Sequence, residues 1–403
     1  MKEEKYEETM EIVKKIALKV NESGGKMYFV GGMVRDEVMN TLLNTKYTNK
    51  DIDTETFGIS VENFKRILSS FGEVDFVGES FGVFKIKHLD VDFAMPRTEK
   101  KVGEKHTDFE VSVNPYLPLE IATKRRDFTI NQLMKDVITD EIIDKYNGIE
   151  DIKNHKIKHI NDETFQEDAL RIFRAAQFAA RFNFEIDKDT IELSKLMNVK
   201  DIANERVESE FAKALKKSNK PSIFFKYLKE MNHLDEFFMF NSQMEKNLEL
   251  LDKATFFTNR TKYKKEFLLA VLFFNVNPKI IYKNLSKLTN QVHTLQLVTE
   301  LNENILTMLK IDKLNKTDIR LFCQKIKYLN ELMLYAELLG MNKELLMDIK
   351  EDFEKVAKIP LIRGRNLISL GLQPSPEFGK LLEKANYLQC EGYSKEEILK
   401  RLV

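Results

Sequence analysis

Two groups of residues in the first 60 positions have the types and spacing needed to bind phosphate and divalent metal ions. The segment FVGGMVRD carries Gly31 and Gly32 between an apolar stretch and a helix-like stretch. Glycines at such a turn let backbone N–H groups approach a phosphate closely, and Arg35 adds positive charge there. Asp51 and Asp53 follow, and alternate residues of a strand point to the same side, so both carboxylates suit a hard ion such as Mg2+.

A third carboxylate, Asp92, lies in VDFAM on a later predicted strand and could join this pair. Each motif alone has a simpler explanation, because a double glycine is often only a tight turn and an Asp-x-Asp is often a solvated strand end. The two motifs at this distance favour a joint site for phosphate and metal.

A second group of residues could select a nucleotide. Arg126 and Asp127 in RRDFTIN offer planar donors and an acceptor for phosphate and ribose. Asp168, Arg171 and Arg174 recur at i, i+3 and i+6, close to one face of a predicted helix. A carboxylate that accepts from an exocyclic amino group and an arginine that donates to a ring nitrogen would accept cytosine and adenine and reject uracil and guanine. Surface salt bridges are the alternative explanation for both motifs.

The hydrophobic periodicity predicts an α/β region that ends near Gly148, followed by helices from about residue 160 onward without further strand-like alternation. The low content of 15 Gly and 8 Pro in 403 residues agrees with a mostly helical chain. The predicted helices of the α/β region are 7–24, 33–43 and 60–71, and the predicted strands are 27–31, 73–77, 83–87, 89–95 and 140–144.

Composition excludes several classes of protein. Lys and Arg number 64 and Asp and Glu number 64, so the chain is not a uniformly basic nucleic-acid binder, although segments 213–229 and 258–288 are locally basic. Two cysteines without a CxxC predict a reducing cytoplasm and no disulfide framework. The charged N-terminal stretch and the lack of long apolar runs predict no signal peptide and no membrane span.

Taken together, FVGGMVRD, the Asp-x-Asp pair, RRDFTIN, EDALR and NERVESEF resemble the class II CCA-adding tRNA nucleotidyltransferases. This family lies within the polymerase-beta-like nucleotidyltransferase superfamily, which also includes bacterial poly(A) polymerases. The resemblance implies an elongated multidomain protein with an α/β head followed by an all-α neck, body and tail. The implied domains are a head at 1–155, a neck at 156–216, a body at 217–330 and a tail at 331–403.

The resemblance also implies site roles. The implied catalytic residues are Asp51, Asp53 and Asp92, of which Asp51 and Asp53 hold two Mg2+ ions that act on an RNA 3′-hydroxyl and on the leaving pyrophosphate. The implied nucleotide-binding residues are Gly31, Gly32, Arg35, Arg97, Arg126, Asp127, Asn131, Asp168, Arg171 and Arg174. Glu205 and Arg206 are expected to brace the selecting helix through an ion pair. Many relatives have a basic residue where this chain has Gln177, so no role is carried over to that position.

The implied function is template-independent addition of CCA from CTP and ATP to the 3′ end of tRNA, with no membrane or protein partner. The expected tRNA contacts are Lys262, Lys264 and Lys265 in the basic segment, and Arg363 and Arg365 in a motif similar to the family's C-terminal one. Alternatives are an A-adding or CC-adding enzyme, a poly(A) polymerase, or a non-catalytic RNA-binding relative. Residues 97–124 fill a segment that CC-adding relatives tend to lack, which favours at least A addition.

Overall fold

The computed structural model describes residues 3–48, 51–77, 82–101, 109–373 and 375–402. The chain forms two compact units: Met1–Ser218 with Ile223–Glu236, and Asn219–Ser222 with Phe237–Val403. The first unit contains the segments predicted as head and neck together with residues 223–236 of the predicted body, and the second contains most of the predicted body and the tail. The finer boundaries at residues 155 and 330 stay a prediction.

A seven-stranded mixed sheet is the framework of the first unit, with the strand order β3-β4-β5-β2-β1-β8-β9. Neighbouring strands pair antiparallel except β2 and β5, which are parallel. Parallel strands need a crossover connection, which α3 (Val61–Ser69), β3 and β4 provide here. The strands are β1 (Lys26–Val30), β2 (Ile52–Phe57), β3 (Val74–Val77), β4 (Val83–Ile86), β5 (Val91–Ala94), β8 (Met134–Asp136) and β9 (Ile142–Ile143).

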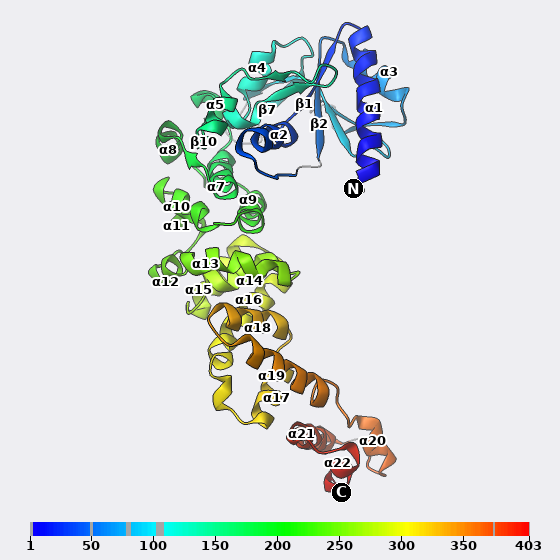
Figure 1. The fold of residues 1–403 in the computed structure, drawn as a ribbon, viewed down its shortest axis with the longest axis vertical. Helices are drawn as coiled ribbons and strands as arrows, with labels where there is room; N and C mark the ends of the chain where they lie inside the picture. Colours follow the sequence, from blue (N-terminus) through cyan, green and yellow to red (C-terminus); the bar gives the residue numbers. More distant parts are fainter. Residues whose placement is uncertain (1–2, 49–50, 78–81, 102–108, 374, 403) are drawn as a thin grey trace. The chain divides into compact units, whose positions relative to one another are not determined.

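Apolar side chains on both faces of β1 fix how helices cover the sheet. Tyr28 and Val30 form a cluster with Phe57 and Met134, against which Leu119 of α4 (Leu119–Lys124) packs. α1 (Glu3–Glu22) packs against β1 and α3, as Figure 1 shows at its blue end. The α/β head and its predicted strands and helices are therefore confirmed, including α2 (Gly32–Leu43).

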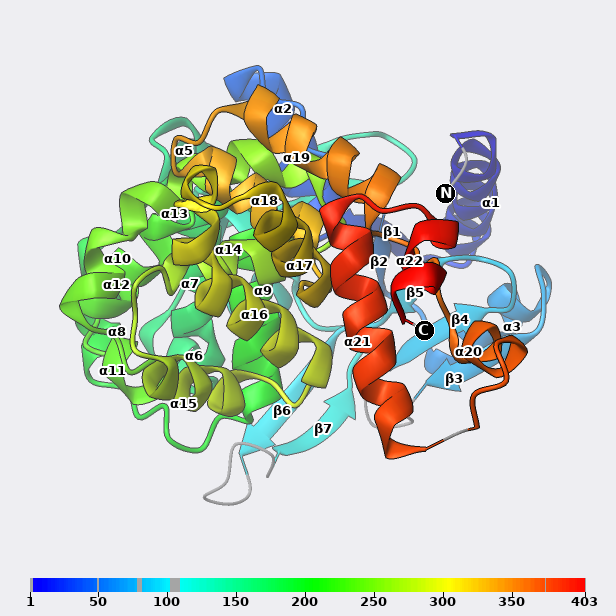
Figure 2. The same ribbon diagram turned by 90° about the horizontal axis from the view of Figure 1, so that it is seen from below.

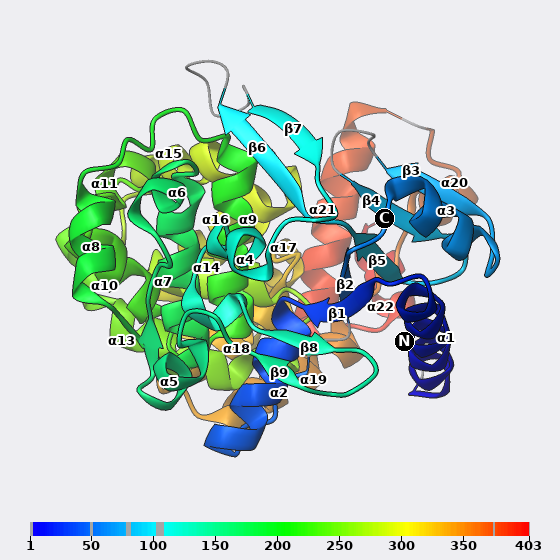
Figure 3. The ribbon, with the colours of Figure 1, turned by 90° about the horizontal axis from the view of Figure 1, so that it is seen from above.

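Sequence periodicity missed a separate hairpin. β6 (Arg97–Lys101) and β7 (Phe109–Val113) pair antiparallel outside the main sheet, and Figure 3 shows them apart from β1, β8 and β9. This hairpin lies within the segment 97–124, of which residues 102–108 lie outside the described part of the chain.

The rest of the first unit is helical apart from one very short pair of strands. β10 (Lys156–Ile157) and β11 (Glu185–Ile186) pair in parallel on either side of α6 and α7. The prediction that no strand returns after residue 160 is therefore wrong at β11, because two residues are too few to show an alternating pattern. The helices are α5 (Gly148–Lys153), α6 (Asp162–Gln166), α7 (Leu170–Phe182), α8 (Lys188–Lys195), α9 (Asn204–Lys217), α10 (Ser222–Glu230) and α11 (Leu234–Phe237).

The second unit contains helices and no strand among its described residues, so the prediction of a helical remainder is confirmed there. One core surrounds Tyr335, which is fully buried and donates its hydroxyl to the carbonyl of Ala270 at 3.0 Å. Further along the chain α21 runs beside α17, as Figure 2 shows. The principal helices are α12 (Ser242–Lys246), α13 (Leu248–Ala254), α14 (Lys264–Leu272), α15 (Pro278–Leu288), α16 (Val292–Met308), α17 (Lys316–Lys325), α18 (Leu329–Leu338), α19 (Lys343–Val356), α20 (Gly364–Ser369), α21 (Pro376–Glu391) and α22 (Lys395–Leu402). Within the described ranges, every helix is too short or too polar to cross a membrane.

Candidate active site

The double glycine forms the turn between β1 and α2. Gly31 has φ 74° and ψ −141°, a conformation that other residues adopt only with strain, and it precedes the first turn of α2 without a side-chain cap. A Cβ added to Gly31 would lie 3.5 Å from Asp53 Oδ2, an ordinary contact. The backbone angle therefore explains the glycine better than lack of space does. The uncapped first turn of α2 presents N–H groups that suit an anion.

Three predicted carboxylates converge beside this turn. The parallel register of β2 and β5 places Asp53 directly opposite Asp92, and Asp51 immediately precedes β2. Burial raises the pKa of Asp53, and the negative charges of Asp92 and Asp51 raise it further. Lys85 Nζ pairs with Asp92 Oδ1 at 2.8 Å and partly offsets this repulsion.

This donor set fits Mg2+. A divalent cation would relieve the mutual repulsion that the raised pKa of Asp53 reflects. Among the described residues, no group of three His, Cys, Asp or Glu side chains forms a ready-made metal cage. Mg2+ does not require one, because it is commonly bound by one or two carboxylates together with substrate phosphates and water.

The RRDFTIN segment is anchored to its surroundings by each of its charged residues. Arg126 Nη2 pairs with Glu55 Oε2 of β2 at 2.8 Å, and Arg125 pairs with Glu167 at 3.3 Å. Asp127 is buried, and its Oδ1 accepts a hydrogen bond from Asn131 Nδ2 at 2.9 Å. These contacts fix the segment between the sheet and the neck helices.

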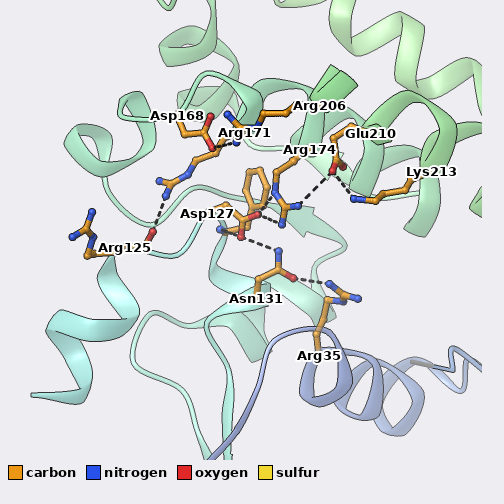
Figure 4. Close-up of polar contacts among 11 residues, drawn as sticks. Arg35, Arg125, Asp127, Asn131, Asp168, Arg171, Arg174, Arg206, Glu210 and Lys213 are labelled. Carbon is orange, nitrogen blue, oxygen red and sulfur yellow. Dashed lines mark hydrogen bonds and ion pairs between the residues drawn. The ribbon is translucent and has the colours of Figure 1, made fainter. Parts of the chain in front are cut away.

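Asp127 is the central carboxylate of this region (Figure 4). Its Oδ2 pairs with Arg174 Nη2 of α7 at 2.6 Å. Burial alone would raise the pKa of Asp127, but the charge of Arg174 and the hydrogen bonds from Asn131 and Arg174 lower it below its ordinary value. The same pair raises the pKa of Arg174. Asp127 is therefore ionised and tied to the helix predicted to select the nucleotide.

The predicted base-reading residues lie at the start of α7. Arg171 is on the helix, whereas Asp168 lies in the link from α6, before α7 begins at Leu170, and its Oδ1 accepts a hydrogen bond from the N–H of Leu170. Arg171 donates to the backbone carbonyls of Thr164 (2.5 Å) and Arg125 (2.7 Å). Asp168 Oδ2 accepts from Arg206 Nη2 at 2.8 Å (Figure 4), which confirms the predicted brace from α9 for Arg206.

One cavity of about 420 Å³ brings most of the predicted site together. This volume lies in the range of small-ligand sites. The predicted residues that line it are Gly31, Gly32, Arg35, Asp53, Arg126, Asp127, Asn131, Asp168, Arg171 and Arg174, and two others, Arg125 and Phe178, join them. Asp51, Asp92 and Arg97 are not among its lining residues. Arg97 begins the β6–β7 hairpin instead.

Arg35 has a different environment from the one its motif predicts. The residue is only 3% exposed, and its guanidinium donates to Asp36 Oδ1 at 2.6 and 2.8 Å and to Asn131 Oδ1 at 2.7 Å. Burial lowers its pKa despite the paired Asp36. Arg35 therefore lines the cavity and also braces the glycine turn through Asp36 and Asn131. The sequence did not point to Asp36, because the partners of a buried charge depend on the tertiary fold.

The basic residues predicted to bind RNA differ in exposure. Lys262 is exposed, whereas Lys264 is half-buried and burial lowers its pKa. Lys265 is 7% exposed and its Nζ lies 3.4 Å from Gln291 Oε1, so the prediction that it faces RNA is wrong. α14 is apolar on nearly all sides, and both flanks of the helix are therefore covered.

The two arginines predicted in the tail are both exposed, at the start of α20. The backbone N–H of Arg363 donates to Asn366 Oδ1 at 2.9 Å, which fixes how α20 begins. The side chains of Arg363 and Arg365 are therefore accessible to a charged partner.

The head is similar to a known family of domains. Residues 27–158 match the family model described as the poly A polymerase head domain, which covers the sheet, the carboxylates and the RRDFTIN segment. The fold of the chain thus combines this head with a helical remainder.

Individual relatives are similar over about half of the chain. The multifunctional CCA protein of Mannheimia succiniciproducens is 37% identical over 214 residues, which are 51% of this chain and 48% of that protein. The CCA-adding enzyme of Actinobacillus succinogenes is 36% identical over 215 residues, 52% of this chain and 50% of that protein. The chain thus spans about half the length of the curated relatives it matches.

Solved structures share the fold over nearly the whole chain. The Bacillus stearothermophilus CCA-adding enzyme in complex with CTP matches with a TM-score of 0.72 and 21% identity, covering 98% of this chain and 97% of that one. The Thermotoga maritima CCA-adding enzyme complexed with tRNA matches with a TM-score of 0.69 and 20% identity, covering 98% and 95%. The fold shared with these enzymes therefore extends over the helical second unit as well.

Proposed function

We propose that the protein is a CCA tRNA nucleotidyltransferase, which adds CMP, CMP and AMP from CTP and ATP to the 3′ end of tRNA without a nucleic-acid template. One observation carries the proposal. A single cavity is lined by the glycine turn and Asp53 together with Asp168 and Arg171. A nucleoside triphosphate bound there would place its phosphates near α2 and its base near α7.

Asp51 and Asp53 are the proposed Mg2+ ligands, with Asp92 as the third carboxylate. When bound, the ions would supply electrostatic stabilisation of the phosphate charge that develops during transfer. The residues of the chain bind and orient the substrates. The first turn of α2 is proposed to receive the phosphates, and Arg126 and Asp127, which line the same cavity, are the proposed contacts of the phosphates and ribose.

Base selection is proposed for Asp168 and Arg171. Arg171 is fixed by two carbonyls and Asp168 by Arg206, so the pair presents a preorganised acceptor and donor. A carboxylate oxygen accepts more than one hydrogen bond, and a guanidinium has further N–H donors. Cytosine and adenine would satisfy both groups, whereas uracil and guanine would leave buried polar groups unpaired.

The proposed RNA partner is tRNA, because the chain shares its fold with an enzyme solved with tRNA. Exposed Lys262, Arg363 and Arg365 of the second unit are the proposed phosphate contacts. A cytoplasmic location is proposed as well, since a reducing compartment agrees with the two free, buried cysteines, Cys323 and Cys390.

The test uses tRNA transcripts that end before the CCA, after the first C and after the second C, each incubated with Mg2+ and one nucleotide at a time. We expect C on the first two and A on the third, with no further addition. Addition of A alone, or of C alone, would reduce the proposal to a partial enzyme. Continued A addition would instead favour a poly(A) polymerase, which the family model of the head also admits.

A variant of one carboxylate tests the metal assignment. Asp53→Asn should abolish transfer while tRNA binding is retained, because the RNA contacts lie in the second unit. Asp75→Asn, at an exposed aspartate of β3, is the matched control and should leave transfer unchanged. Full activity of Asp53→Asn would refute the metal assignment. If the wild-type protein itself transfers no nucleotide, the chain would instead be a non-catalytic RNA-binding relative.

A further inference from the structure

Arg181 contacts the phosphate-binding turn from the far end of the selecting helix. It lies near the C-terminal end of α7, and its Nη2 pairs with Asp36 Oδ2 at 3.3 Å. Asp36 belongs to the second turn of α2 and binds Arg35 through its other oxygen. None of the sequence motifs includes Arg181, and it does not line the cavity of about 420 Å³.

Aromatic rings hold these charges in place. The Arg181 guanidinium lies 4.9 Å from the ring centroid of Phe182 and 6.0 Å from that of Tyr47, and these two rings meet edge to face at 5.1 Å. The Arg35 guanidinium lies 4.8 Å from Phe182 and 5.2 Å from Phe178. Side chains of α7 thus hold the start of α2, and the Arg181 side chain is 14% exposed.

A chain of polar contacts connects this clamp to the selecting residues. Arg35 donates to Asn131, Asn131 donates to Asp127, and Asp127 pairs with Arg174 on α7 (Figure 4). Arg174 and Arg181 lie two turns apart on α7, so they share a face of the helix. The first turns of α2 are consequently bound to α7 at two separate points.

The charge balance at Asp36 shows that Arg181 is not required to neutralise it. Arg35 and Arg181 both pair with this one carboxylate, and the charge of Arg181 contributes to lowering the pKa of Arg35. Lys217 adds to the excess of positive charge in this region. Burial lowers its pKa, and the repulsion from Arg181 and Lys213 lowers it further. Loss of Arg181 would leave a neutral Arg35–Asp36 pair, so it should cost little stability.

We propose that Arg181 is a positioning residue that holds the phosphate-binding turn of α2 at a fixed separation from the base-reading end of α7. This role rests on the proposed nucleotidyltransferase function and adds a specific residue to it. Because the ion pair acts on α2, its loss should affect recognition of the phosphates and leave recognition of the base and ribose unchanged.

The test compares the binding of CTP, ATP and CMP, in the presence of Mg2+, by the wild-type protein and by Arg181→Gln and Arg181→Lys. In Arg181→Gln we expect CTP and ATP to bind about tenfold more weakly and to the same extent, with CMP binding and the melting temperature unchanged. Arg181→Lys should recover part of the loss, because an ammonium can still pair with Asp36. Arg66→Gln, at an exposed arginine of α3, is the matched control and should bind all three nucleotides normally.

Two results would overturn the role of Arg181. One is unchanged CTP binding in Arg181→Gln, and the other is equal weakening of CTP and CMP, which would indicate a general structural defect. If Arg181→Gln fails to fold, the same comparison of CTP with CMP in Arg181→Lys decides the matter. A wild-type protein that binds neither CTP nor ATP would refute the proposed function itself, a failure distinct from the first two.

Discussion

Arg171 is the residue whose surroundings say most about selectivity. Its two hydrogen bonds to the carbonyls of Thr164 and Arg125 connect α6, α7 and the RRDFTIN segment through a single guanidinium. Burial lowers its pKa, and the nearby carboxylates of Asp127 and Asp168 oppose this effect. A lysine has a point charge in place of the planar fork, so it cannot reproduce both bonds and still face a base.

Arg171→Lys should therefore reduce the discrimination between nucleotides more than it reduces the stability of the fold. We expect the preference for CTP and ATP over UTP and GTP to fall by about tenfold or more, the equivalent of one hydrogen bond to a charged group. Single-nucleotide incorporation with each of the four triphosphates measures this ratio. An unchanged ratio would refute base reading by Arg171.

Asp127 predicts a pH dependence of stability. Its folded pKa lies below the unfolded value of about 3.9, so its contribution to the free energy of unfolding is complete above that pH and is lost as the pH falls through the folded pKa. Asp127→Asn should lower the free energy of unfolding of the first unit by about 2 kcal/mol at pH 7, because it leaves Arg174 partly buried without its main partner. Denaturant unfolding should show this gap shrinking below about pH 4. A gap that stays constant with pH would contradict the assignment.

At the residue scale, the sequence predicted the residues of the cavity better than their partners. The glycines, aspartates and arginines of the cavity could be predicted from their motif spacing, because the chemistry needs those residue types at those positions. Arg35 was expected to contact phosphate and it lines the cavity, but its pairing with the buried Asp36 was not predicted. The glutamate that pairs with Arg126, Glu55, also carries no sequence signal, since a single charged residue on a strand is common.

At the scale of elements, the turn between β1 and α2 depends on Gly31. Gly31→Ala forces an alanine into positive φ, which should cost about 1–2 kcal/mol of stability and shift the first turn of α2. Nucleotide binding should weaken as a result, as isothermal titration with CTP would show. Gly24→Ala is the control, because Gly24 also has positive φ, at 87°, with open space around its Cα. It should lose similar stability without losing CTP affinity, and equal binding by both variants would count against the role of the turn.

Elements with long or strongly periodic patterns were predicted well. The strands β1, β3, β4, β5 and β9 and the helices α1, α2 and α3 follow the apolar spacing of the sequence, whereas the three-residue strand β8 was not predicted. The β6–β7 hairpin was not predicted, because its strands, RTEKK and FEVSV, are polar or short and lie outside the main sheet. The exposure of Lys265 was predicted wrongly, because α14 is apolar on nearly all sides and this charged residue is buried together with its apolar neighbours.

At the scale of the whole molecule, the neutral total charge of the chain hides exposed basic positions in the second unit. Lys262→Gln should weaken tRNA binding and reduce the slope of log affinity against log salt by about one. Lys265→Gln is a matched control on the same segment, because its side chain is buried and cannot release a counterion from RNA. Binding isotherms across salt concentrations should separate the two variants, and equal slopes would contradict this assignment.

The order of an α/β head followed by helices was predictable from the change of period near residue 160. Motifs beyond residue 216 are few, so the sequence alone gave little for the second unit. Its fold became clear only from the structure, whose likeness to CCA-adding enzymes extends over nearly the whole chain at low identity.

The short parallel pair β10–β11 has a consequence for the kinetics of local opening. The N–H of Glu185 donates to the carbonyl of His155 at 2.8 Å, and the N–H of Asp187 donates to that of Ile157 at 2.9 Å. These bonds join the two ends of the segment that contains α6 and α7, so we expect them to restrict the movement of α7. The amides of residues 185 and 187 should therefore exchange with deuterium as slowly as those in the middle of α7, although β11 has only two residues and Asp187 lies just beyond it.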